Sequence, residues 1–271
     1  MKTQMVLIGL LAVVAAVEAA KLQCPTTEDP ANGIIYGKKA KPHQFPYQAL
    51  VVSYLGNGYD KTCGGSVLTE NYILTAAHCL QNSGSVVTSG KVILGAYNKD
   101  DQEEETQQRI KFGSINIHPH ASGLRNDIAT IRLEKPAVFD DYVQPVILPE
   151  ASDDRTFAGM TGIASSFGRL SEIVRYTSNV IMTNADGSSE LSNNDLKAQY
   201  LWFCIAGDVA VCHGDSGSPL VVKDGDRNLQ AGISLTVTNE GCGTIHPTRF
   251  IRVSHYLAWI VENSDVPVEG K

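Results

Sequence analysis

The chain has 271 residues, a formal net charge of −7 and a hydrophobic fraction of 43%. Net acidity disfavours nucleic acid as a partner, because phosphate-binding proteins usually carry a basic stripe. The apolar content is that of an ordinary packed protein, and the length suits one large domain or two small all-β ones.

The first twenty residues have the layout of a secretory signal peptide. Lys2 precedes the apolar run Val6–Val17, and small residues follow at Ala19 and Ala20. This run is too short to cross a membrane as a helix. We therefore expect residues 1–19 to be a signal peptide, and the mature protein to be secreted, extracellular and without a membrane partner. A buried N-terminal helix is the alternative.

Export makes disulfide bonds an expected feature. The chain has an even number of cysteines, and their spacing alone leaves the pairing open. No CxxC pair is present, which disfavours a structural zinc site. We expect neither a metal nor another cofactor. The cysteines are Cys24, Cys63, Cys79, Cys204, Cys212 and Cys242.

Short β-rich runs recur along the chain, separated by clusters of Gly, Asn, Asp, Ser and Pro. Many short strands with such punctuation are typical of a sandwich or a barrel. The predicted strands are Gln48–Tyr54, Ser66–Thr75, Lys91–Leu94, Ile128–Leu133, Val143–Leu148, Leu220–Lys223 and Gln230–Val237.

Two further segments differ from these runs. Ser254–Glu262 places Leu257, Ile260 and Val261 on one side, which predicts a short amphipathic helix lying on the barrel. Asp100–Thr106 (DDQEEET) is acidic. We interpret the acidic run as a solvated loop; a calcium-binding loop is the alternative, because Ca²⁺ prefers oxygen ligands.

Three segments carry groups suited to nucleophilic catalysis. A serine hydroxyl needs an adjacent base to take its proton, and a histidine can accept and return a proton near neutral pH. Each segment alone is weak evidence for a catalytic site, because Gly, Asp, Ser and Pro are ordinary turn residues. The segments are LTAAHC with His78, RNDIA with Asp127, and VCHGDSGSPL with Ser216.

In this order the three segments resemble the serine proteases of the chymotrypsin fold. The resemblance runs from Ile34 to about Val261 and includes Cys63–Ser66 (CGGS), Ser166–Arg169 (SFGR) and Phe250–Ile260. It implies an all-β fold of two six-stranded antiparallel β-barrels with a C-terminal α-helix, and a site between the barrels.

The resemblance also implies roles for single residues. Ser216 would attack the peptide carbonyl, His78 would act as the base, and Asp127 would hold the imidazole and stabilise its cation. The backbone N–H groups of Gly214 and Ser216 would form the oxyanion hole, which stabilises the developing negative charge.

Two disulfides follow from the resemblance, Cys63–Cys79 and Cys212–Cys242. Cys204 lacks its usual partner in the family, and Cys24 lies in the segment before Ile34. A Cys24–Cys204 bridge and an unpaired Cys204 are equal alternatives.

The expected activation site departs from the family pattern. Members are usually cut before a start similar to Ile34–Gly37 (IIYG), after which the new amino group of Ile34 would pair with buried Asp215. Gly33 precedes this start, where a trypsin-type activator would need Arg or Lys. We expect residues 20–33 to be an activation segment, residues 34–271 to be the protease domain, and the activator to prefer small residues.

The specificity pocket also differs from that of trypsin-like members. Counting back from Ser216 puts Ala210 at the pocket floor with Val211 beside it, where trypsin-like members carry an aspartate. Thr236 and Thr248 stand where the family usually has glycine. Threonines would narrow the pocket, so we expect small or aliphatic residues before the cut bond, with an aromatic preference as the alternative.

A third difference is Ser218, which replaces a usual glycine. Serine is small and suits a turn, so we do not interpret it as a loss of activity.

The sequence therefore predicts a secreted serine endopeptidase that hydrolyses peptide bonds through an acyl-enzyme intermediate. Its expected partners are polypeptide substrates and protein inhibitors, and the expected state is a monomer. The alternative is a catalytically silent homologue that acts as a secreted binding or regulatory protein. The complete set of His, Asp and Ser argues against this alternative, whereas the unusual activation site and the narrowed pocket argue weakly for it.

Overall fold

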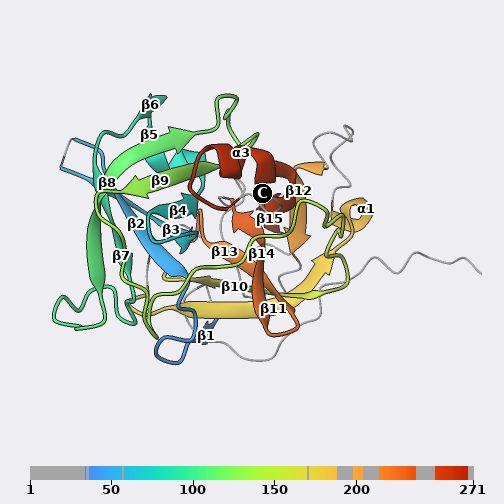
Figure 1. Ribbon diagram of the computed structural model, residues 1–271, viewed down its shortest axis with the longest axis horizontal. Coiled ribbons are helices and arrows are strands. Elements are labelled where there is room, and N and C mark those ends of the chain that lie inside the picture. Colours follow the sequence, from blue (N-terminus) through green and yellow to red (C-terminus); the bar gives the residue numbers. More distant parts are fainter. Residues whose placement is uncertain are drawn as a thin grey trace, which may run out of the picture.

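Two β-barrels lie side by side in the computed structural model, which describes residues 34, 37–56, 58–169, 171–187, 198–203, 214–235 and 248–267 (Figure 1). The first is a closed antiparallel barrel in the order β2-β3-β4-β9-β8-β7. Its strands are β2 (Gln48–Tyr54), β3 (Asp60–Val67), β4 (Tyr72–Thr75), β7 (Gly90–Leu94), β8 (Gln108–Ile117) and β9 (Ala129–Leu133).

The second barrel also contains six strands, in the order β11-β10-β13-β14-β15-β12, and the pairing of β12 with β11 closes it. Its strands are β10 (Thr161–Ser166), β11 (Arg175–Met182), β12 (Tyr200–Phe203), β13 (Pro219–Asp224), β14 (Arg227–Ser234) and β15 (Thr248–Arg252). The short strand β1 (Lys38–Lys39) adds to β11 from outside. The predicted fold of two six-stranded barrels is therefore confirmed.

The remaining elements are short. The first barrel also carries the 3₁₀ turn η1 (Ala77–Leu80) and the small hairpin of β5 (Gln81–Asn82) and β6 (Ser85–Val86). The second barrel carries α1 (Asn184–Gly187) and ends in η2 (Val253–Tyr256) followed by α3 (Leu257–Glu262). None of the helices in the described ranges is long and apolar enough to span a membrane.

Two of the predicted strands are wrong. Ser66–Thr75 is the end of β3, a turn and β4, so one apolar run supplies both strands of a hairpin. Val143–Leu148 is no strand but a connection that bonds to both barrels, with Val146 N–H donating to Val67 O and Ile147 N–H to Asn228 O. Pro145 lacks the N–H that a continuous ladder would need.

The other predicted elements are confirmed with shifted ends, except that residues 236 and 237, at the end of the predicted strand Gln230–Val237, lie outside the described ranges. Gln48–Tyr54 coincides with β2, and Lys91–Leu94 and Leu220–Lys223 lie within β7 and β13. The predicted terminal helix begins as the 3₁₀ turn η2 and continues as α3, with Ile260 fully buried.

Buried side-chain hydrogen bonds join the two barrels. Ser66 Oγ donates to Gln230 Oε1 at 2.7 Å, and Ser165 Oγ donates to Gln48 Oε1 at 2.8 Å. All four side chains are buried, so each polar group depends on its partner in the other barrel. These pairs set the relative position of the barrels at the surface where the site lies.

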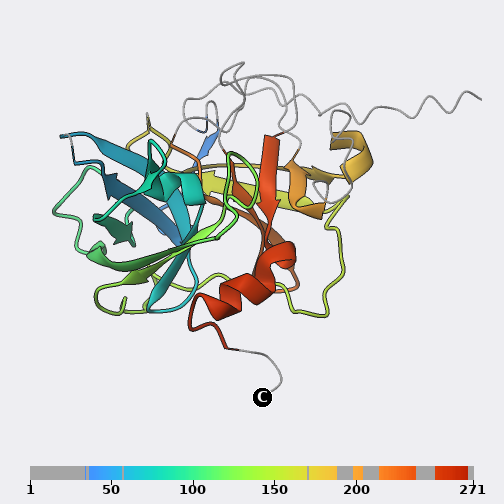
Figure 2. The same cartoon turned by 90° about the horizontal axis from the view of Figure 1, so that it is seen from above.

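The C-terminal segment connects the barrels a second time. Figure 2 shows α3 leaving the second barrel and lying across to the first. Thr130 Oγ1 donates to Asn263 O at 2.6 Å, and Asn71 Nδ2 donates to Asp265 Oδ2 at 2.7 Å.

The acidic run is a loop with a carboxylate at its centre. Most side chains of Asp100–Thr106 are exposed, as expected for a solvated loop. Glu104 instead turns inward and accepts the N–H groups of Tyr97 at 2.7 Å and Asn98 at 3.0 Å. Burial opposes its ionisation, but hydrogen bonds from Gln107 and from the backbone hold the pKa of Glu104 below its ordinary value. N–H donors of Tyr97, Asn98 and Gln107 therefore bind the Glu104 carboxylate within the loop.

Arg252 in β15 is a buried cation held by neutral oxygens. It donates to Thr156 O at 3.0 Å, Tyr200 O at 2.9 Å and Asn184 Oδ1 at 3.1 Å, and burial lowers its pKa to about 10. We expect Arg252→Met to lower the free energy of unfolding by about 3 kcal/mol, because buried carbonyls lose their donors. Urea unfolding measures this, with Arg132→Met on the exposed face of β9 as control. Equal stability of the two variants would contradict the prediction.

A histidine cluster lies where β8 ends against the terminal helix. The His118 ring is 5.6 Å from Tyr256 and 5.4 Å from Trp259, between ring centroids. Burial, and then repulsion from His120 and His255, lowers the pKa of His118.

This lowered pKa predicts a loss of stability in acid. The unfolded chain takes up a proton at a pH of about 6.5, which the folded state resists, so the free energy of unfolding should decrease as the pH falls below that value. His118→Phe keeps a ring but cannot be protonated, so its stability should depend less on pH between 7 and 5 than that of the parent. Chemical unfolding at several pH values tests this, with His43→Phe as control; equal pH slopes in parent and His118→Phe would refute it.

Candidate active site

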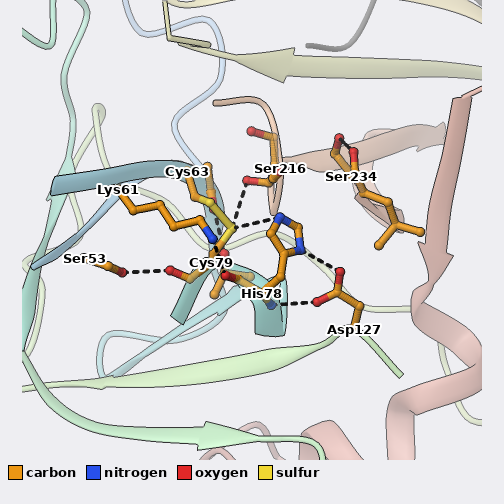
Figure 3. Close-up of a disulfide and its surroundings, with 12 residues drawn as sticks. Ser53, Lys61, Cys63, His78, Cys79, Asp127, Ser216 and Ser234 are labelled. Atoms are coloured by element: carbon orange, nitrogen blue, oxygen red, sulfur yellow. Dashed lines mark hydrogen bonds and ion pairs between the residues drawn. A yellow bond between two sulfur atoms is a disulfide. The ribbon is translucent and has the colours of Figure 1, made fainter. Parts of the chain in front are cut away.

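His78 and Asp127 come together because the strands that carry them are paired. β4 and β9 are antiparallel with Thr75 opposite Ala129, so the residues after β4 and before β9 emerge at one edge of the barrel. Asp127 Oδ2 lies 2.6 Å from Nδ1 of His78, and Oδ1 accepts the backbone N–H of His78 at 2.8 Å (Figure 3). An ionised carboxylate only accepts hydrogen bonds, so Nδ1 carries the proton and Nε2 is left with a lone pair.

The side chains of Asp127 and His78 differ in how far they are exposed to solvent. The side chain of Asp127 is 1% exposed, whereas that of His78 is 24% exposed. The imidazole can therefore reach a substrate while its carboxylate partner is shielded from water, which strengthens their interaction.

Asn126 holds the turn just before Asp127, and the sequence did not single it out. Its φ of +49° lies in the left-handed region that few residues other than glycine adopt, although asparagine tolerates it. The side chain holds this turn by accepting Tyr256 Oη–H at 3.0 Å and donating to His120 O at 3.0 Å. In the sequence, the only sign that Asn126 matters was its place next to Asp127 in the run RND.

A disulfide fixes the turn that carries His78. Cys63 in β3 and Cys79 in η1 are bonded, with an S–S distance of 2.01 Å. Ser53 Oγ donates to Cys79 O at 2.9 Å, and Lys61 Nζ donates to His78 O at 2.6 Å. Cys63, His78 and Cys79 are close enough to share a metal ion, but sulfur atoms bonded to each other are not available as thiolate ligands.

Ser216 lies in a loop held by backbone bonds from both barrels. Gly64 N–H donates to Ser216 O at 2.8 Å, and Gly217 N–H donates to Ser234 O at 2.8 Å. Gly217 has a φ of +83°, and a Cβ there would lie 2.4 Å from Gly64 O. Only glycine suits this position, which explains the residue after Ser216.

The structure brings Ser216 next to His78 without a hydrogen bond between their side chains. Sγ of Cys79 lies 3.8 Å from Nε2 of His78 and 3.6 Å from the backbone oxygen of Ser216, so both residues contact one sulfur atom (Figure 3). Both residues lie in the described ranges, and the Ser216 hydroxyl is not hydrogen-bonded to the His78 imidazole there.

Gly214, the expected oxyanion-hole residue, is packed against the loop after β10. Its φ is +92°, and a Cβ there would lie 2.5 Å from Arg169 N and 2.7 Å from the carbonyl carbon of Gly168. A side chain would therefore push this loop away. Lys99 Nζ holds the loop from the other side by donating to Gly168 O at 3.1 Å.

Ser218 fits its position because Gly64 opposite has no side chain. A Cβ on Gly64 would lie 1.8 Å from Ser218 Oγ, and this hydroxyl donates to Ser166 Oγ at 3.0 Å. The serine in place of glycine is thus accommodated by Gly64 of β3 and Ser166 of β10.

The remaining predicted site residues are only partly described. Ile34 and Asp215 are both buried, and Ile34 packs in the core of the second barrel with Phe157. Thr248 begins β15 opposite Phe203 and is half-buried. The residues that lie outside the described ranges are Ala210, Val211, Thr236, Cys24, Cys204, Cys212, Cys242, Gly33 and the segment 1–33.

The family model described as Trypsin matches residues 34–260. The chain belongs to the trypsin family. It is 31% identical to a chymotrypsin of Phaedon cochleariae over 98% of this chain and 99% of that protein. It is 30% identical to chymotrypsin-C of Mus musculus over 93% of this chain and 97% of that protein. The solved structure named HL collagenase has a TM-score of 0.75 and 28% identity, and covers 85% of this chain and 98% of that one.

This trypsin-family chain is accordingly a serine endopeptidase of the chymotrypsin and elastase type, which acts on polypeptides. The protease has a cleft of about 560 Å³ beside His78 and Ser216. The cleft is lined by β3 and the segment before it, the β5 hairpin, Gly214 and Arg169. It therefore runs between the first barrel and the loop after β10.

Proposed function

We propose that the chain is a secreted serine endopeptidase in which Ser216 is the nucleophile, His78 the base and Asp127 the group that orients the imidazole. The observation that carries this proposal is the 2.6 Å contact of buried Asp127 with Nδ1 of His78, which directs a basic Nε2 toward the Ser216 loop. Hydrogen bonds of this kind often form fully only in the substrate complex. The Ser216–His78 hydrogen bond is thus the contact that substrate binding would complete.

The reaction would proceed in two halves. Ser216 Oγ attacks the peptide carbonyl as Nε2 of His78 takes its proton, and Asp127 stabilises the imidazolium. The N–H groups of Gly214 and Ser216 stabilise the oxyanion. His78 then protonates the leaving amine, which leaves Ser216 acylated, and water attacks the acyl-enzyme with His78 again as base.

Processing would precede activity. In this proposal residues 1–19 direct export, residues 20–33 are removed, and residues 34–271 form the active enzyme. The new amino group at Ile34 would then pair with Asp215, whose burial makes an isolated charge costly. The glycine at position 33 points to an activator that prefers small residues, and the specificity proposed below would let the enzyme activate itself.

The proposed specificity is for small or aliphatic residues before the cut bond. It is supported by the absence of Asp or Glu at positions 210 and 211, by threonines at 236 and 248, and by a relative named chymotrypsin-like elastase family member 3B, which is 30% identical. An aromatic preference is the alternative, in keeping with the relatives named chymotrypsin. Protein inhibitors and a monomeric state remain part of the proposal.

One experiment tests these points together. The chain is expressed with its leader, the secreted product is sequenced from its N-terminus, and a fluorophosphonate probe is applied before and after cleavage at Gly33–Ile34. We expect labelling of Ser216 only after cleavage. A peptide library then reports the preference, and dominant cutting after Arg or Lys would overturn the pocket assignment. No labelling under any processing would instead support the silent homologue.

A further inference from the structure

The cleft beside Ser216 is lined mainly by the first barrel, with Lys61 and Cys63 of β3 next to His78. Of the residues predicted for the specificity pocket, only Thr248 in the second barrel lies in the described ranges, and it does not line the cleft. In the proposed reaction His78 protonates the amine of the leaving part of the substrate. Because the cleft opens beside His78, the part after the cut bond would enter it.

The cleft carries two cations in a chain of net charge −7. Arg169 is exposed at its edge, and the Arg169 guanidinium makes no hydrogen bond or ion pair with the described residues. Lys61 is half-buried and uses one of its three N–H donors on His78 O at 2.6 Å. Both cations therefore retain donors for a ligand.

Lys61 is held by its side chain and Arg169 by its backbone. The ammonium of Lys61 is anchored next to the turn that carries His78. The backbone of Arg169 packs on Gly214, and its carbonyl accepts Lys99 Nζ–H at 3.3 Å. The anchored ammonium of Lys61 therefore loses less side-chain entropy on binding a ligand than a free one would.

One acidic side chain in the cleft partly offsets the positive charges of Lys61 and Arg169. Asp60 lines the same cleft and is exposed. The other polar side chains of the cleft, such as Gln81 and Asn82, are neutral. Two cations and one carboxylate leave the cleft with a positive balance, against the negative charge of the whole chain.

We propose that this cleft binds the part of the polypeptide after the cut bond and favours an acidic side chain there, with Lys61 and Arg169 setting the preference. The inference rests on the proposed function, because it concerns the same site. A carboxylate on the substrate would accept hydrogen bonds from the Lys61 ammonium and the Arg169 guanidinium. Such charge-assisted hydrogen bonds are stronger than neutral ones. A lysine in the substrate would meet two like charges.

The test compares peptides that differ only by Glu, Gln or Lys at the first or second position after the cut bond. We expect kcat/KM for the better Glu peptide to exceed that of its Gln counterpart about fivefold, with Lys slowest. Arg169→Gln and Lys61→Gln should each bring the Glu-to-Gln ratio toward one, and Arg169→Lys should retain most of it. Asp60→Asn should raise the ratio, and Lys135→Gln, an exposed charge outside the cleft, should leave it unchanged.

The ratio is used because Lys61 also anchors the His78 turn, so Lys61→Gln is expected to slow all peptides. Equal rates for Glu, Gln and Lys in the parent, or a ratio that neither Arg169→Gln nor Lys61→Gln changes, would overturn the inference. Cleavage of the Gln peptide and probe labelling of Ser216 report the proposed function separately. Calorimetric binding of Glu and Gln peptides to Ser216→Ala measures the preference without turnover; equal affinities there would also refute it.

Discussion

Ser216→Ala is expected to lower kcat by a factor on the order of 10⁶ while leaving the fold intact. Without the hydroxyl there is no acyl-enzyme, and only binding and the oxyanion hole remain to promote attack by water. The loop itself should not change, because its bonds to Gly64 and Ser234 use backbone atoms of Ser216 and Gly217.

The measurement is hydrolysis of the best library peptide by the processed enzyme, with thermal unfolding of the variant alongside. His78→Ala should cost a similar factor, and the double variant should be little worse than either, since the two groups act as a unit. Ser218→Ala serves as the neighbouring control and should retain most of the activity, because the Ser218 hydroxyl bonds to Ser166 and not to His78 or Ser216. Turnover by Ser216→Ala within tenfold of the parent would disprove the assignment of the nucleophile.

Asp127→Asn should lower kcat by about 10⁴-fold with little change in KM. The carboxylate accepts two hydrogen bonds from His78, one from the backbone N–H and one from Nδ1. An amide offers one oxygen and one NH₂ in the same place, so its NH₂ would face a donor unless the imidazole adopts the other tautomer. That tautomer has its proton on Nε2 and cannot accept one from Ser216.

The KM should be nearly unchanged because Asp127 is buried and does not itself line the cleft. Steady-state kinetics on the same peptide separate the two parameters, and Asp226→Asn, in the exposed turn between β13 and β14, is the control for loss of one carboxylate. A variant that raised KM and kept its kcat would show that Asp127 shapes substrate binding instead of the reaction.

Much of the fold could be predicted from the sequence, but the strand boundaries could not. Short runs rich in apolar and β-branched residues, bounded by turn residues, identified β2 and β7, and nearly all of their side chains are buried. The run Ser66–Thr75 was wrongly predicted as one strand because its turn, at Thr69–Asn71, contains neither glycine nor proline. Val143–Leu148 was wrongly predicted as a strand because a connection that packs between two barrels has the same apolar spacing as a strand.

The sequence by itself determined the chemical groups of the site. His78, Asp127, Ser216 and the glycines at 214 and 217 lie in short local motifs, because the reaction needs those residue types and the tight turns that carry them. Their roles, and the residues expected at the specificity pocket, followed from the resemblance to a family and stay predictions.

Only the tertiary structure decided which groups face one another. Lys61 and Arg169 share a cleft although the chain between them includes most of the first barrel, and nothing in the pattern around either residue indicates this. The neutral oxygens around Arg252 and the rings around His118 also come from distant segments. Such contacts depend on strand register and barrel closure, which are set by the packing of the whole chain and not by any local run of residues.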